Sequence, residues 1–102
     1  MEHIRYSVAA CQTDMPNPID RTSMRANTDR MLSMIDSAVA GAAPFLPVRL
    51  VVFPEFAHSA PVFQTAGELL EKLAVRIPNE HTERLQEKAR QHDIYIQTGT
   101  ML

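Results

Sequence analysis

The sequence has one cysteine, no tryptophan and no long run of apolar residues among its 102 positions. A single thiol cannot close an internal disulfide, which excludes a disulfide-stapled secreted fold, so we expect a cytoplasmic protein in a reducing compartment. The apolar runs are too short to cross a bilayer, and the first residues lack the basic and apolar regions of a signal peptide. We therefore expect no membrane partner.

Basic and aromatic residues are also sparse. The formal net charge is −2, aromatic residues make up 6% of the chain, and the lysines and arginines are scattered. This composition argues against a phosphate-tracking surface and a base-stacking platform, so we expect no nucleic-acid partner. The four histidines, His3, His58, His81 and His92, show no paired spacing of metal ligands. We predict neither a metal site nor a cofactor.

What remains is ordinary for one small globular domain, with 45% hydrophobic and 22% charged residues. Short apolar segments predict strands, and apolar residues three and four apart predict helices. The predicted strands are Ile4–Gln12, Arg49–Phe53 and Ile94–Met101, and the predicted helices are Thr22–Ala40, Ala66–Val75 and a segment from the capping residue Asn79 to about His92. Because helices separate the strands, we predict an α/β fold with βαβ units and a largely parallel sheet.

Local signals predict how the helices begin, end and pair. Asp20 or Thr22 can cap the first helix, and Gly41 can end it in a left-handed conformation. In the last helix, Glu80 and Arg84 stand four residues apart with the acid first, a spacing that allows an ion pair.

The residue of greatest chemical interest is Glu55, which directly follows a predicted buried strand. In open α/β sheets, ligands bind outside the carboxyl ends of the strands. Pro54 fixes the backbone before Glu55 and removes an amide hydrogen, and a carboxylate held at the rim of an apolar strand can serve as a general base. Taken alone, Phe-Pro-Glu also suits a helix-capping or surface-paired glutamate, which is the commoner role.

Five segments of the chain form a joint pattern. They are Val8-Ala9-Ala10-Cys11-Gln12, Asn27 early in the first helix, Ala38-Val39-Ala40-Gly41-Ala42 at its end, Leu50-Val51-Val52-Phe53-Pro54-Glu55, and Ile96-Gln97-Thr98-Gly99-Thr100. Together they resemble the start of the nitrilase superfamily of carbon–nitrogen hydrolases, and the segment that ends at Glu55 is the most specific piece. The resemblance covers essentially the whole chain, so residues 1–102 would be the incomplete N-terminal segment of a carbon–nitrogen hydrolase domain.

The resemblance implies the N-terminal portion of an α-β-β-α sandwich and an enzyme with a Glu, Lys and Cys triad. By resemblance, Glu55 takes the proton from the cysteine thiol, since a thiol needs a base to become a nucleophilic thiolate, and the lysine stabilises the oxyanion. The implied substrates are small amides, nitriles or carbamoyl compounds. A sandwich cut after its third strand leaves sheet surface uncovered, so we also expect a homo-oligomer.

The triad is incomplete within this chain, because the family's lysine and cysteine lie further along than Leu102. Cys11 lies in the first predicted strand and is expected to be an inert core thiol. Lys72 and Lys88 fall on predicted helices and are expected to be surface residues. We therefore predict that the 102-residue chain alone is inactive.

The segment after Glu55 departs from the family pattern. Many members have a Gly-Tyr pair a few residues on, whereas this chain has Phe56-Ala57-His58-Ser59-Ala60-Pro61-Val62-Phe63 within a predicted loop that reaches Gln64. We predict that Phe56 and His58 contact the substrate. In the alternative interpretation, Phe56 and Phe63 are core residues, because large aromatic side chains mostly serve packing.

A second functional hypothesis stays open from the sequence: a non-catalytic α/β module that binds a small molecule or a protein. The alternation of strands and helices fits it. However, Gln12-Thr13-Asp14-Met15-Pro16 after the first strand contains no glycine, so it cannot cradle a phosphate as glycine-rich turns do. A lysine and a cysteine at later strand ends would favour the enzyme.

Overall fold

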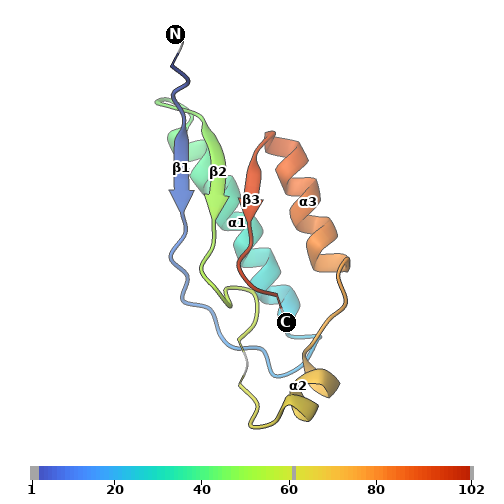
Figure 1. Ribbon diagram of the computed structural model, residues 1–102. Helices are drawn as coiled ribbons and strands as arrows, with labels where there is room; N and C mark the ends of the chain where they lie inside the picture. Colours follow the sequence, from blue (N-terminus) through green and yellow to red (C-terminus); the bar gives the residue numbers. More distant parts are fainter. Residues whose placement is uncertain (1–2, 61, 102) are drawn as a thin grey trace.

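The computed structural model describes residues 3–60 and 62–101, which include a sheet of three parallel strands (Figure 1). The strands are β1 (Ser7–Ala10), β2 (Val48–Val52) and β3 (Tyr95–Gln97), with β2 in the centre. Their carboxyl ends meet at one edge, the lower edge in Figure 1. This is the edge at which open α/β sheets bind ligands.

Helices connect the strands, as the sequence predicts. α1 (Met24–Ala42) joins β1 to β2, and α2 (Ala66–Lys72) and α3 (Glu80–His92) join β2 to β3. The predicted α/β fold with a parallel sheet is therefore confirmed. The described residues between 53 and 65 form neither helix nor strand, and Pro61 of this predicted loop lies outside the described residues. Among the described helices, none is long and apolar enough to span a bilayer.

Gly41 does not end α1 as predicted. The helix continues through Gly41 to Ala42, and the Ala43 N–H still donates to Val39 O at 3.1 Å. Pro44 explains the stop, because it has no amide hydrogen with which to continue the helical bonding pattern. The end of α1 is thus set by a missing donor rather than by a left-handed residue.

The N-cap of α1 is Ser23, so the prediction that Asp20 or Thr22 caps this helix is wrong. The Asp20 carboxylate instead accepts a hydrogen bond from the Ser23 N–H at 2.8 Å, which orders the turn just before the helix. α3 begins as predicted: the Asn79 carboxamide oxygen accepts bonds from two backbone N–H groups of the first turn, at 2.8 and 2.9 Å. These bonds satisfy donors that a helix start otherwise leaves free.

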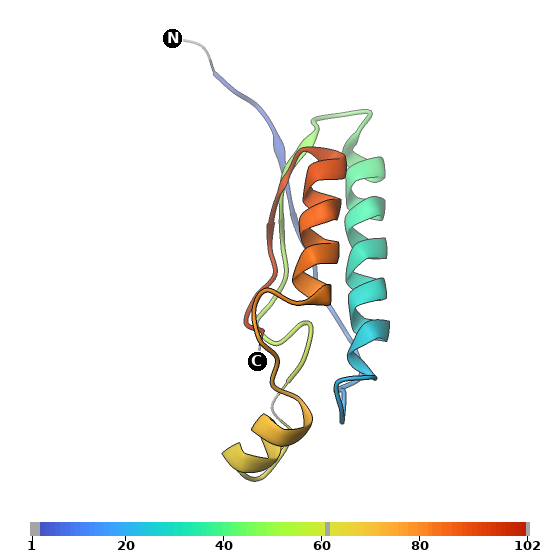
Figure 2. The same ribbon diagram turned by 90° about the vertical axis from the view of Figure 1, so that its right-hand side faces the viewer.

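α1 and α3 lie side by side on one face of the sheet and form a single helical layer (Figure 2). The apolar stripe of α1 faces β2, because residues three and four apart share one side of a helix. The core that results is made of Met31, Ile35, Val48, Val51, Phe53, Ala57, Leu85 and Ile94.

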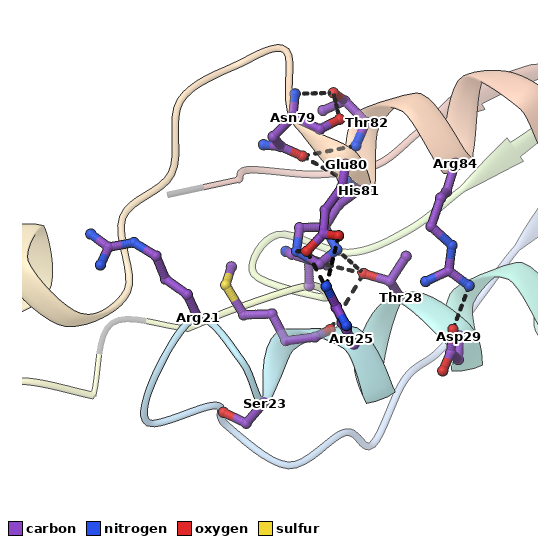
Figure 3. Close-up of polar contacts among 12 residues, drawn as sticks. Arg21, Ser23, Arg25, Thr28, Asp29, Asn79, Glu80, His81, Thr82 and Arg84 are labelled. Atoms are coloured by element: carbon purple, nitrogen blue, oxygen red, sulfur yellow. Dashed lines mark hydrogen bonds and ion pairs between the residues drawn. The ribbon is translucent and has the colours of Figure 1, made fainter.

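Charged side chains join α1 to α3 on the outer side of this layer (Figure 3). Arg25 pairs with Glu80 at 3.2 Å, and Asp29 pairs with Arg84. The prediction that Glu80 and Arg84 pair with each other is therefore wrong, because each finds a partner on the facing helix. The side chains are largely exposed, so these pairs contribute little to the stability of the fold.

α2 lies below the carboxyl edge of the sheet, away from the helical layer (Figure 1). The Arg21 guanidinium group holds it there by donating to the carbonyl oxygens of Ala74 at 2.9 Å, Glu71 at 2.7 Å and Leu70 at 2.7 Å. Leu70 and Glu71 belong to the last turn of α2, where a helix leaves its acceptors without intrahelical partners, and Ala74 follows that helix. Arg21 thus fastens α2 to the segment before α1.

The second face of the sheet lies open and is mainly apolar. Val8, Leu50 and Tyr95 are in register across the three strands, and Val8 and Tyr95 are 52% and 75% exposed. Tyr6, Leu50 and Tyr95 help to line a hollow of about 560 Å³ on this face. Exposed apolar patches of this kind mark surfaces that bind a partner.

We predict that the 102-residue chain associates through this open face. In sedimentation velocity, its weight-average mass should rise with concentration, because association removes the apolar row from water. Val8→Lys together with Tyr95→Lys should keep the chain monomeric, whereas Leu70→Lys on α2, where Leu70 is 67% exposed, should leave association unchanged. A monomer at every concentration, or equal association of all three proteins, would contradict this prediction.

Candidate functional site

Glu55 lies at the carboxyl edge of the sheet, just beyond β2. The Phe53 N–H still donates to Gln97 O at 2.9 Å, and Pro54 then leads the chain out of the sheet. The Glu55 side chain is exposed and takes part in no ion pair among the described residues. Its carboxylate is therefore not committed to a structural contact with a cation.

A tight turn presents Glu55. The Ala57 N–H donates to Pro54 O at 3.2 Å and closes a β-turn with Glu55 and Phe56 at its two central positions. Phe56 has a φ angle of 59°, in the left-handed region, whereas Glu55 has no positive φ. Of the common turns only type II combines these conformations, and it favours glycine at the position of Phe56. A non-glycine residue there is strained by roughly 1–3 kcal/mol, so the surroundings must hold the turn.

Gly99, in the loop after β3, packs directly against this turn. A Cβ atom at Gly99 would lie 2.3 Å from Pro54 O and 3.4 Å from Glu55 Cα, and the φ angle of Gly99 is 79°. Glycine alone fits both the close approach and the left-handed conformation without strain. The loop after β3 therefore supports the main chain of the Glu55 turn by contact.

Glu55 lines a polar hollow of about 310 Å³ between the loop after β1 and the loop after β2. The lining residues are Thr13, Asp14, Met15, Pro16, Asn17, Asn27, Pro54, Glu55, Phe56, Ala57 and Ser59. Most of their side chains can form hydrogen bonds, and two of them, Asp14 and Glu55, carry carboxylates. The hollow therefore suits a small polar compound better than an apolar one.

The structure separates the two residues predicted to contact a substrate. Phe56 is half-buried and lines the hollow, whereas His58 is 0% exposed and lies outside its lining. Substrate contact by either residue stays a prediction, and in this conformation only Phe56 can touch a compound in the hollow. Phe63 is half-buried, with the Lys72 ammonium group 5.7 Å from its ring centre. Neither Phe56 nor Phe63 belongs to the buried core cluster.

His58 belongs to a buried polar cluster between α1 and α3. His58 Nε2 lies 2.8 Å from Thr28 Oγ1, and His81 Nδ1 lies 2.7 Å from the same oxygen; Figure 3 shows Thr28 and His81 meeting between the two helices. The two imidazole rings are 4.6 Å apart. Thr28 has a single hydroxyl proton, so at least one ring must donate to it. The cluster fastens the loop after Glu55 to both helices.

Both imidazoles of this cluster resist protonation. Burial lowers the pKa of His58 to about 4, and the neighbouring His81 is a second cause. Burial also lowers the pKa of His81, although Glu80, 3.7 Å away, opposes that shift. His58 Nδ1 and the Ser59 hydroxyl are buried without a hydrogen-bond partner among the described residues. A proton added to His58 would therefore create a buried charge with no acceptor at Nδ1.

The cysteine and the two helical lysines lie apart from the hollow around Glu55. Cys11 is half-buried beside α1, and burial raises the pKa of its thiol, as in structural cysteines. Lys88 pairs with Asp36 at 3.0 Å, and Lys72 lies on α2. Within the described part of the chain, no group of three or more His, Cys, Asp or Glu side chains could hold a metal ion.

Asn27 shapes the site, although from the sequence it is only one piece of a family pattern. Its side chain is buried, 3% exposed, and Nδ2 donates to Pro16 O and to His58 O, both at 3.0 Å. The sequence feature that could have indicated this role is an asparagine beside the apolar stripe of a helix, because a buried polar side chain needs hydrogen-bond partners. Which partners these are depends on loops far apart in the sequence.

We predict that Gly99→Ala lowers the free energy of unfolding by about 1–3 kcal/mol. The new methyl group would collide with Pro54 O at a position with positive φ. Gly41→Ala is the matched control, because a Cβ atom there meets nothing within 4 Å, and alanine should stabilise the helix by up to about 1 kcal/mol. Urea denaturation measures both values, and a Gly99→Ala protein as stable as the unsubstituted chain would contradict the close contact.

We also predict that the fold loses stability as the pH falls from 6.5 towards about 4. Unfolded His58 titrates near 6.5 and folded His58 near 4, so the unfolded state binds more protons in this window. The stabilisation is complete above this window, and its loss is on the order of 3 kcal/mol. Urea unfolding of His58→Gln should depend less on pH, and that of His3→Gln should match the unsubstituted chain. A pH-independent stability of the unsubstituted chain would contradict this prediction.

A known protein family matches nearly all of the chain. The model of the family described as "Carbon-nitrogen hydrolase" matches residues 7–102. No curated protein and no solved structure matches the chain. The parallel three-stranded sheet with its three helices is consistent with part of the nitrilase fold. The chain therefore belongs to the carbon–nitrogen hydrolase family of the nitrilase superfamily, a family of enzymes.

Proposed function

We propose that Glu55 is the general base of a carbon–nitrogen hydrolase that acts on a small non-peptide amide, nitrile or carbamoyl compound. The strongest support is the position of Glu55 in a polar hollow at the carboxyl edge of the sheet, with no ion pair among the described residues. Family membership supports the class of reaction. Phe56 forms an apolar part of the wall against which the substrate rests.

In the proposed reaction on an amide, Glu55 takes the proton from a cysteine thiol, and the thiolate attacks the carbonyl carbon. A lysine ammonium group stabilises the oxyanion of the tetrahedral intermediate. The C–N bond then breaks, the amine leaves with the proton that Glu55 returns, and a thioester remains. Glu55 next takes a proton from water, whose oxygen attacks the thioester and releases the acid and the thiol.

We propose that the nucleophilic cysteine and the lysine come from outside these 102 residues, since Cys11, Lys72 and Lys88 do not line the hollow. The chain is then the N-terminal part of an α-β-β-α sandwich, and its open sheet face is where the second sheet packs. His58 could touch substrate only if its ring left the buried cluster. We place the intact protein, as a homo-oligomer, in the cytoplasm, where thiols stay reduced.

We predict that Glu55→Gln lowers kcat of the complete gene product by about 100- to 10,000-fold, because glutamine cannot accept the thiol proton. The melting temperature should change little, since the Glu55 side chain is exposed. Glu71→Gln on α2 is the matched control and should keep full activity, because Glu71 does not line the hollow. Release of ammonia from simple amides measures the rates.

Equal rates for Glu55→Gln and Glu71→Gln would contradict the role of Glu55 as the base. The 102-residue chain by itself should release no ammonia from the same amides. Hydrolysis by this chain that depended on both its thiol and Glu55 would contradict the proposal that the triad is completed elsewhere.

A further inference from the structure

Asn27 links the two loops that form the hollow around Glu55. It stands in the first turn of α1, is 3% exposed, and uses Nδ2 to donate to Pro16 O on one loop and to His58 O on the other, both at 3.0 Å. An amide nitrogen carries two hydrogens, so both are engaged by backbone acceptors of the opposing walls. One buried side chain therefore sets the spacing between the walls.

Of the two loops that Asn27 binds, the loop after β2 contains a strained turn. The Glu55 turn contains Phe56 at a φ angle of 59°, a conformation that bulky side chains avoid. The closing bond of the turn, from Ala57 N–H to Pro54 O, is 3.2 Å long. His58, whose carbonyl group Asn27 binds, directly follows this turn, so the Asn27 bond limits how far the turn can relax.

Asn27 stands on a helix that is fixed in place by its buried residues. α1 is anchored in the core through Met31 and Ile35, both 0% exposed. Thr28, the next residue of α1, binds the imidazole of His58 at 2.8 Å, while Asn27 binds its carbonyl group. Two successive helical residues thus fix the side chain and the main chain of one loop residue, but only Asn27 also reaches the loop after β1.

We propose that Asn27 is a positioning residue for Glu55: it holds the Glu55 turn against the opposite wall, so that the carboxylate stays where a thiol proton can reach it. The inference rests on the proposed function of Glu55 as the base. Asn27 itself needs no contact with substrate, since it acts through backbone carbonyl groups. A displacement of about 1 Å in a reacting group can lower a rate about 100-fold.

The test compares Asn27→Ala with Asn79→Ala in the complete gene product. Asn79 is a suitable control because its carboxamide also makes several backbone hydrogen bonds, but at the start of α3 and away from the hollow. Asn27→Ala should lower kcat by about 10- to 100-fold and change KM by less than about threefold. Asn79→Ala should leave kcat unchanged even where the two variants lose similar stability.

Hydrogen exchange followed by mass spectrometry provides the second readout. The peptide that covers residues 53–60 should exchange faster in Asn27→Ala than in Asn79→Ala, because Ala57 N–H closes the turn. Should Asn27→Ala fail to fold, Asn27→Ser replaces it: the hydroxyl can donate to one carbonyl group only, so kcat should fall by a smaller factor.

The outcomes separate the two proposals. Suppose that Glu55→Gln is inactive while the Asn27 variants match Asn79→Ala in kcat and in hydrogen exchange of the 53–60 peptide. The positioning role of Asn27 is then wrong, and the role of Glu55 as the base is unaffected. If Glu55→Gln retains full activity, the proposed function is wrong. If Asn27 had a purely structural role, its replacement would lower stability without lowering kcat more than it changes KM. That result would also overturn the inference.

Discussion

The hydrogen bond from Ala57 N–H to Pro54 O is the constraint on which the site depends. Along a strand, alternate residues share one face, so continuation of β2 would point Glu55 to the same side as the buried Val51 and Phe53. The turn ends that alternation before the carboxylate reaches the helical layer. A charged group therefore follows directly after a strand with one buried face, without the large desolvation cost of burial.

The turn is held from two directions by residues distant in the sequence, and one of its own residues is buried in the core. Gly99 meets Pro54 from the loop after β3, Asn27 binds His58 O from α1, and Ala57 itself is part of the buried core. Gly99 and Asn27 both act on the main chain, so neither needs to bind the Glu55 carboxylate to restrain the turn. A strained residue such as Phe56 persists only where the surroundings determine its conformation in this way.

The sequence predicts the elements of the fold well because their causes are local. Apolar periodicity identifies the helices, and the capping residue Asn79 marks the start of α3. The position of Glu55 at the sheet edge follows equally from its place after a short apolar strand. The ends of α1 were harder to predict, since a glycine such as Gly41 can stop a helix or lie within it.

The rest of the site depends on contacts that no local pattern contains. His58 stands in a loop whose composition indicates exposure, yet α1 and α3 enclose its ring between Thr28 and His81. The pairing of Glu80 with Arg25, rather than with its neighbour on α3, likewise depends on the facing helix. Packing between residues far apart in the sequence decides which loop residues are buried and which charges pair, and a single sequence does not reveal that packing.

The most direct test of the role of Glu55 is a crystal structure of the complete gene product with the proposed nucleophilic cysteine intact. If Glu55 is the base, one of its carboxylate oxygens should lie within hydrogen-bond reach of the cysteine sulfur, at roughly 3–3.5 Å. A second sheet should then cover the open face of β1, β2 and β3. A Glu55 carboxylate directed into bulk water, with the cysteine in a separate pocket, would contradict the account.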